Sequence, residues 1–192
     1  MKMSRIMKAV EKKIPSHFLP EIESIIIADI SKITKEEHLL EGDTIYISNE
    51  HYCEDLLVEN FTIAAGESLF DKYEHLIHNE ELEKEFLEKR RDLYYDFVKI
   101  YKDIALSDFM ILEESCHFTK SMKRIGFDDV IYNTQKHFIN YDSCLSLKNY
   151  FSHLFFSYLE GNINKKKFQG FMKIINKVGK SCKENTNYEK NN

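Results

Sequence analysis

The spacing of apolar residues predicts a chain that is mostly helical from Glu54 onward. Over 54–73, Leu57 and Phe61 recur at the helical interval. The same spacing predicts amphipathic helices over 79–106 and 165–178 and a strongly apolar helix over 146–161. Gly126 is expected to break the mixed segment that precedes 146, and Gly161 to end the helix that begins there.

Before Glu54 the pattern changes to that of strands. The run 22–30 is rich in isoleucine and predicts a buried strand, because β-branched residues favour a pleated surface. A turn at Gly42-Asp43 leads into an alternation of Ile45 and Ile47 against Tyr46, which predicts a second strand. The stretch between them, 31–40, fits a short helix or a crossover. The expected fold is therefore α+β and mostly helical, with a small N-terminal sheet and a long-helix core.

Charge divides the chain into an acidic body and two basic ends. Residues 1–14 carry net +4 and residues 161–192 net +6, which leaves −15 for 15–160 out of a total of −5. We expect a basic N-terminal helix or arm over 1–14, one domain over 15–180, and a polar disordered tail over 181–192. The acidic body argues against nucleic acid as its partner. The basic ends are suited to an acidic partner or to a nucleic acid, but solvated and partly disordered ends explain their charge better. The N-terminal helix is expected to lie outside the body.

The cysteines and the apolar runs of the sequence bear on the cellular location of the protein. Its four cysteines have no C-x-x-C spacing and are expected to be free thiols in a reducing compartment. No apolar run reaches the length of a membrane span, and the N-terminal residues lack the apolar stretch of a signal peptide. We therefore expect no membrane association, and a cytoplasmic or virion location reached without a signal peptide.

The middle of the predicted helix 54–73 is unusual. It reads Ile63-Ala64-Ala65-Gly66-Glu67, and a glycine inside a helix costs about 1 kcal/mol relative to alanine. The sequence contains no glycine-rich phosphate loop and no G-x-S-x-G elbow. His75 and His78 are spaced for a metal, but a solvated helix end explains them better. Cys116-His117 is discounted as a nucleophile and base, because adjacent helical residues do not face each other.

Several motifs, taken in order, resemble zincin-type metallopeptidase domains of the anthrax lethal factor-like family. The strand pattern G-x-x-I-Y-I-S is present at 42–48, followed by an acidic linker at 49–55. A helix ending in Ser68-Leu69 and Asp71-Lys72-Tyr73 then follows, and Lys148-Asn149-Tyr150-Phe151 lies on a later helix. The resemblance covers roughly 14–161 and implies a zincin-like domain.

The resemblance also implies which residues occupy the positions of the zinc site. The H-E-x-x-H positions hold Ile63 to Glu67, so the ligand positions are Ile63 and Glu67 and the general base is replaced by Ala64. The third ligand position, on the later helix, holds Asn149. We therefore expect no zinc, no other cofactor and no peptidase activity. The former metal site would consist of Ile63, Ala64, Glu67 and Asn149.

The resulting hypothesis is a pseudoenzyme that binds another protein or has a structural role. The composition, rich in Lys, Asn, Ile and Phe, favours a phage or viral virion or accessory protein over a bacterial cytosolic regulator. One alternative is a residual metal-dependent peptidase with a displaced site at Glu67 and His153, helped by Asp142 or Tyr141. Tyr141 and His153 are the expected cleft residues in either case. The other alternative is an unrelated helical interaction domain.

Overall fold

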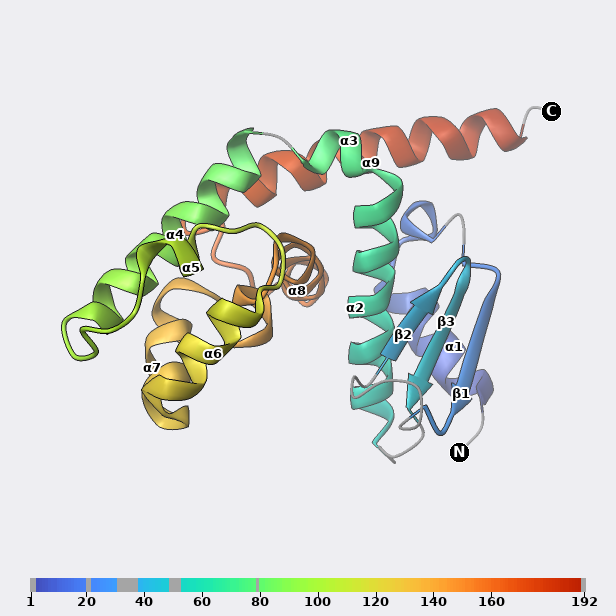
Figure 1. Ribbon diagram of the computed structural model, residues 1–192. Coiled ribbons are helices and arrows are strands. Elements are labelled where there is room, and N and C mark those ends of the chain that lie inside the picture. Colours follow the sequence, from blue (N-terminus) through green and yellow to red (C-terminus); the bar gives the residue numbers. More distant parts are fainter. Residues whose placement is uncertain (1–2, 20–21, 31–37, 49–52, 79, 191–192) are drawn as a thin grey trace.

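Helix α2 runs through the middle of the molecule and separates its two sides (Figure 1). The structure is a computed structural model that describes residues 3–19, 22–30, 38–48, 53–78 and 80–190. The sheet and α1 pack on one side of α2, and α8 packs on the other. The elements are, in chain order, α1 (Met3–Lys13), η1 (Ser16–Phe18), β1 (Ser24–Ala28), β2 (His38–Glu41), β3 (Thr44–Ser48), α2 (Glu54–Lys72), α3 (Glu74–Ile77), α4 (Glu80–Val98), α5 (Leu106–Phe109), α6 (Cys116–Ile125), α7 (Phe127–His137), η2 (Asp142–Cys144), α8 (Leu147–Leu159) and α9 (Gln169–Lys190).

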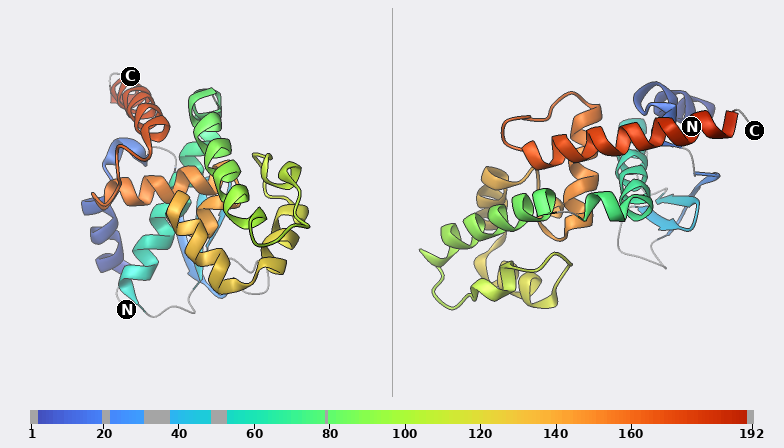
Figure 2. Two further views of the ribbon diagram at one scale, coloured as in Figure 1. Left: turned by 90° about the vertical axis from the view of Figure 1, so that its left-hand side faces the viewer. Right: turned by 90° about the horizontal axis from the view of Figure 1, so that it is seen from above.

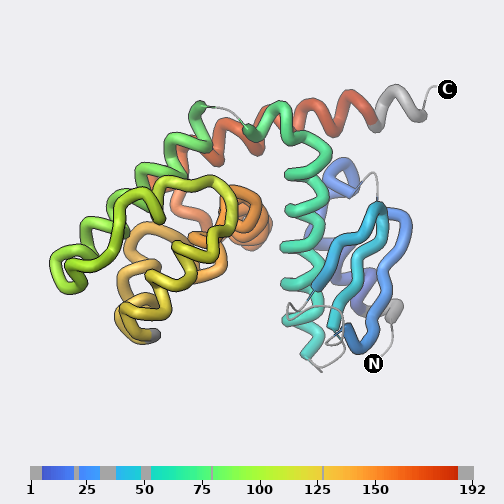
Figure 3. Tube along the Cα trace, viewed as in Figure 1, coloured from blue at the N-terminus to red at the C-terminus, as the bar shows by residue number. Residues whose placement is uncertain are grey.

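The α+β, mostly helical class is confirmed, and the helices on the far side of α2 form a layer of their own. The chain passes from α2 through the short α3 into α4, where it turns away from the sheet (Figure 3). Helix α9 runs along the top of the molecule as drawn in Figure 1, so that it crosses in front of the other elements when seen from above (Figure 2, right), and it contacts α3, α4, α8 and η1. No helix in the described part of the chain is long and apolar enough to cross a membrane.

The sheet has the strand order β1-β3-β2, with β1 parallel and β2 antiparallel to the central strand β3. The prediction of β3 is confirmed, because Ile45 and Ile47 are fully buried while Tyr46 is partly exposed. The strand predicted within 22–30 exists, but the expectation that it is buried is wrong. It lies at an edge of the sheet, and Ile26 remains 41% exposed. Isoleucine favours strands at an edge as well as at the centre, so composition alone does not place them.

Strand β2 was missed by the sequence prediction of a helix or crossover over 31–40. Its four residues pair with β3 in an antiparallel ladder, in which His38 lies opposite Ile47. The part of that prediction over 31–37 lies outside the described residues. A strand this short has no periodicity of its own and is specified by its pairing partner.

The close approach of α2 to α8 explains the small residues in the middle of α2. Ala64 and Ala65 are fully buried. A Cβ atom added to Gly66 would lie 2.9 Å from the Cα atom of Ser152 and 3.2 Å from a ring carbon of Phe155, both on α8. Glycine is therefore required at this contact, and its cost in helix propensity is offset by the packing of two backbones.

Arg90 of α4 is the largest fully buried side chain among the described residues. It donates hydrogen bonds to the carbonyl oxygens of Cys144 at 2.8 and 2.9 Å, Leu145 at 2.5 Å and Ile111 at 2.5 Å. The aromatic rings of Phe86 and Phe118 lie over its guanidinium, with centroids at 4.8 and 4.1 Å. Burial lowers the pKa of Arg90 to about 10, so the group stays charged at neutral pH. Arg90 thereby fixes the loop around η2 to the core.

Both ends of the chain differ from the expected arm and tail. The helix expected within 1–14 is present as α1, but it does not lie outside the body. Its apolar face, Ile6, Val10 and Ile14, is buried in the same core as the rest of the molecule. Within the tail expected over 181–192, α9 continues to Lys190 and Cys182 is fully buried, while 191–192 lie outside the described residues. In both helices the apolar residues pack against the core. A segment that is polar on average can still have one apolar face.

The helix expected over 79–106 is shorter than its pattern indicates. α4 ends at Val98, Ile100 is 62% exposed, and Ile104 is buried outside the helix. The break at Gly126 is confirmed, with φ of +97° between α6 and α7. Gly161 follows the end of α8 with φ of +73°, also as predicted.

Candidate functional site

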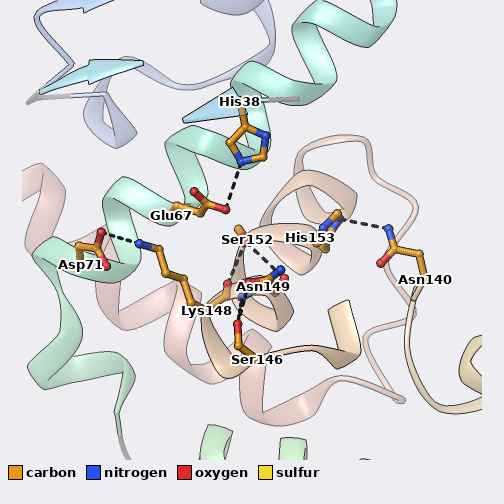
Figure 4. Close-up of polar contacts among 9 residues, drawn as sticks. All are labelled: His38, Glu67, Asp71, Asn140, Ser146, Lys148, Asn149, Ser152 and His153. Atoms are coloured by element: carbon orange, nitrogen blue, oxygen red, sulfur yellow. Dashed lines mark hydrogen bonds and ion pairs between the residues drawn. The ribbon is translucent and has the colours of Figure 1, made fainter. Parts of the chain in front are cut away.

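A polar cleft of about 380 Å³ opens between α2, α8, β2 and the loops on either side of η2. Figure 4 shows the polar contacts of its walls, with Glu67 projecting from α2 and Asn149 and His153 from α8. The lining combines carboxyl, imidazole and amide side chains with a few apolar ones. Its residues are His38, Leu56, Glu59, Asn60, Ile63, Glu67, Glu114, Asn140, Asp142, Leu145, Asn149 and His153.

Glu67 forms the wall of the cleft nearest the sheet. Its Oε1 lies 3.1 Å from Nε2 of His38, the first residue of β2. The two side chains are only 16% and 12% exposed. This contact joins the edge strand to α2 and gives the Glu67 carboxylate a partner inside the protein.

Asn149 is held in place by the start of α8. Ser146 caps this helix, and its Oγ accepts a hydrogen bond from the Asn149 backbone N–H at 3.1 Å. The same hydroxyl donates to Oδ1 of Asn149 at 2.6 Å. Because Oδ1 is the acceptor, the Asn149 amide presents its NH₂ group as the remaining donor.

His153 lies one turn further along α8 and is only 8% exposed. Its Nδ1 lies 3.1 Å from Nδ2 of Asn140, an amide nitrogen that can only donate. The neutral ring therefore carries its proton on Nε2. Burial, as the main cause, lowers the pKa of His153, while the charges of Asp142 and Glu67 act in the opposite direction. Neutral His153 is thus an N–H donor in a cleft rich in carboxylates.

Asn140 is itself fixed by the loop that leads into η2. Its Oδ1 accepts from the backbone N–H of Ser143 at 2.9 Å, and its carbonyl oxygen accepts from the Ser143 hydroxyl at 2.8 Å. Since Arg90 anchors the two carbonyls that follow, this wall of the cleft is connected to the core. The polar groups of the cleft are therefore preorganised.

The structure brings together most of the residues singled out in the sequence. Ile63, Glu67 and Asn149, the three ligand positions implied by the resemblance, all line the cleft, as does His153. Ala64, the position of the general base, is fully buried and does not line it. Tyr141 is partly buried next to η2, where burial raises its pKa, but it is not part of the lining either.

Sequence reasoning missed His38, Glu114 and Asn140 as lining residues. His38 lies in the stretch whose strand was not predicted, and Glu114 and Asn140 lie in loops with no motif. Their positions follow from long-range packing, so no local signal pointed to them.

The titratable side chains of the cleft do not form a metal-binding group among the described residues. Over the part of the chain that the structure describes, no three His, Cys, Asp or Glu side chains are grouped so that they could hold a metal ion. Glu67, His153 and Asp142, the displaced metal site considered above, share the cleft without forming such a group. Away from the cleft, His78 contacts Glu83 at 2.9 Å, as expected of a polar helix end.

Scanned against known protein families, curated proteins and solved structures, the chain matches none of them. The resemblance to zincin-type domains therefore rests on the sequence motifs alone.

Proposed function

We propose that the protein is a metallopeptidase-like binding module without peptidase activity, and that it contacts a protein partner through the cleft between α2 and α8. The observation that carries the proposal is the position of Ile63, Glu67 and Asn149. They come from two helices and line one cleft, as the ligand positions of a zinc site would. The side chains present are an alkyl group, a carboxylate and a neutral amide.

The contacts of these residues support binding over catalysis. Glu67 is paired with His38, and Oδ1 of Asn149 is bonded to Ser146. The position of the general base holds Ala64, whose methyl group is fully buried. A hydrolytic zinc site needs three protein ligands and a base for the attacking water. None of the four positions keeps the residue type of the zinc-site pattern, and of the four only Glu67 carries a side chain of a usual zinc-ligand type.

The first test is elemental analysis and a peptidase assay on the dialysed protein. The proposal predicts far less than one zinc per chain and no cleavage of unstructured peptides. About one tightly held zinc per chain, with cleavage that a chelator abolishes, would overturn it and favour the displaced-site peptidase.

A gain-of-binding variant tests whether Ile63, Ala64, Glu67 and Asn149 occupy the positions of a zinc site. Replacing Ile63→His, Ala64→Glu, Glu67→His and Asn149→Glu together supplies two imidazoles and a carboxylate at the positions implied by the resemblance. We expect zinc uptake that the parent lacks, weakened about 10–100-fold by the missing groups that orient zinc-bound histidines. A control carrying Ala64→Glu alone measures the effect of the buried charge. A folded quadruple variant that takes up no more zinc than the parent would contradict the register.

A further inference from the structure

The cleft has a charge and hydrogen-bonding character that indicate its ligand. Four of its described lining residues are acidic, namely Glu59, Glu67, Glu114 and Asp142, and none is lysine or arginine. Glu67 lines the cleft from α2 and Asp142 from η2, and the charges of both act on the ring of His153. A cationic group in the cleft would therefore meet carboxylates from two elements of the fold.

A second and independent feature is the donor on the wall formed by α8. His153 is more than nine-tenths buried, its Nδ1 is used by Asn140, and its Nε2 makes no hydrogen bond to any described residue. The NH₂ group of Asn149, one turn away, likewise has no acceptor among the described residues. Both donors are open to the cleft, and Asn149 itself is half-buried, so a ligand that supplies oxygen acceptors can accept hydrogen bonds from both.

We propose that the cleft binds a cationic segment of a partner protein, with an arginine or lysine side chain between the carboxylates and a backbone carbonyl on the donors of α8. The inference rests on the proposed binding function and specifies the chemistry of its partner. An extended peptide offers both kinds of group at once, whereas a bare cation offers no acceptor. The volume of about 380 Å³ falls at the lower end of the usual ligand pockets, as suits one long side chain and its adjoining peptide group.

The test is a calorimetric titration of the full chain with short blocked glycine peptides that differ in one central residue. Arginine is compared with citrulline, which has nearly the same shape and no charge. We expect the arginine peptide to bind one to one and more tightly than the citrulline peptide by about tenfold, since charge-assisted hydrogen bonds are the stronger kind. The difference should shrink at high salt.

Three substitutions in the cleft and one control outside it assign the binding to the cleft. Glu67→Gln and Asp142→Asn should each weaken arginine-peptide binding about tenfold. Asp103→Asn removes the same charge from a side chain that is 88% exposed and outside the cleft, and should change affinity less than about twofold. His153→Phe should weaken the binding of the arginine and citrulline peptides alike, because it removes a donor to the backbone. Thermal unfolding of each variant verifies that it is folded.

Equal affinity for arginine and citrulline would overturn the inference, as would equal effects of Glu67→Gln and Asp103→Asn. Absence of saturable binding up to about 1 mM would do the same. Self-association that Glu67→Gln abolishes, without peptide binding, would assign the cleft to a second copy of the chain. Each of these results leaves the zinc and peptidase measurements untouched, so the inference can fail while the proposed function stands.

Discussion

Arg90 and the cleft are both polar regions inside the molecule, and they differ in where their hydrogen bonds go. Arg90 is fully buried, and it uses its donors on three backbone carbonyls between two aromatic rings. In the cleft, Glu67 has a partner in His38, but donors of His153 and Asn149 have no acceptor among the described residues. A polar network whose hydrogen-bonding groups are all paired within the protein stabilises the fold. A network with unpaired donors at an accessible cavity is suited to binding a ligand.

The two regions are also physically connected. Arg90 binds the carbonyls of Cys144 and Leu145, and Leu145 and Asp142 line the cleft. The hydrogen bonds of Arg90 therefore position one wall of the cleft. Substitutions of Arg90 should act mainly on stability, and substitutions of cleft residues mainly on binding.

The largest effect is expected from Arg90→Met, which keeps much of the side-chain length and removes the charge and all donors. The buried carbonyl oxygen of Cys144 and the partly buried ones of Ile111 and Leu145 lose their partner, and each loss at a buried group costs about 1–3 kcal/mol. We expect the free energy of unfolding to fall by about 3 kcal/mol or more, measured by urea denaturation at neutral pH. The neighbouring Arg91 is exposed, so Arg91→Met should change it by less than about 0.5 kcal/mol. Similar losses for the two variants would contradict the role assigned to the Arg90 network.

An intermediate effect is expected from Gly66→Ala, at the contact that keeps α2 and α8 close. The added methyl group would lie 2.9 Å from a backbone atom of Ser152. Overpacking of this kind costs about 1–3 kcal/mol, which exceeds the gain of about 1 kcal/mol in helix propensity. Gly179→Ala is the matched control, because its methyl group would meet only the side-chain ring of Phe18, at 3.3 and 3.6 Å. Thermal unfolding should show a clear loss for Gly66→Ala, and no loss would mean that the two helices can move apart.

The smallest effect concerns the protonation of the cleft. Because the pKa of His153 is lowered in the folded state, the unfolded chain binds the proton more readily. Stability should therefore be full above the unfolded pKa of about 6.5 and fall as the pH drops below it. His17, whose pKa burial also lowers, acts in the same direction, so His153→Gln should remove only part of this dependence.

The measurement is the free energy of unfolding at several pH values between neutral and mildly acidic. Asp142, Glu67 and His38 face His153 and stay in place in the His153→Gln variant. The matched control is His75→Gln, since His75 is exposed. If the free energy of unfolding of His153→Gln depended on pH as that of the parent does, the titration of His153 would not contribute to the pH dependence of stability.

The sequence by itself determined the elements whose signal is local. The spacing of Leu57 and Phe61, the alternation of Ile45 and Ile47, and the break at Gly126 each predicted the structure found there. It also singled out Ile63, Glu67, Asn149 and His153, because the motifs that carry the resemblance fix their relative register along two helices. Periodicity and turn chemistry act over a few residues, so they can be read without knowing the fold.

Tertiary structure alone decided what depends on distant partners. It paired the short strand β2 with β3 and so brought His38 to Glu67. It buried Ile6 of α1 and Cys182 of α9, whose surroundings in the sequence are polar. Gly66 is unfavourable for its helix by local propensity, and the contact with Ser152 of α8 is what requires it. In each case the deciding contact joins residues far apart in the chain, and its free energy comes from packing and pairing that no local pattern encodes.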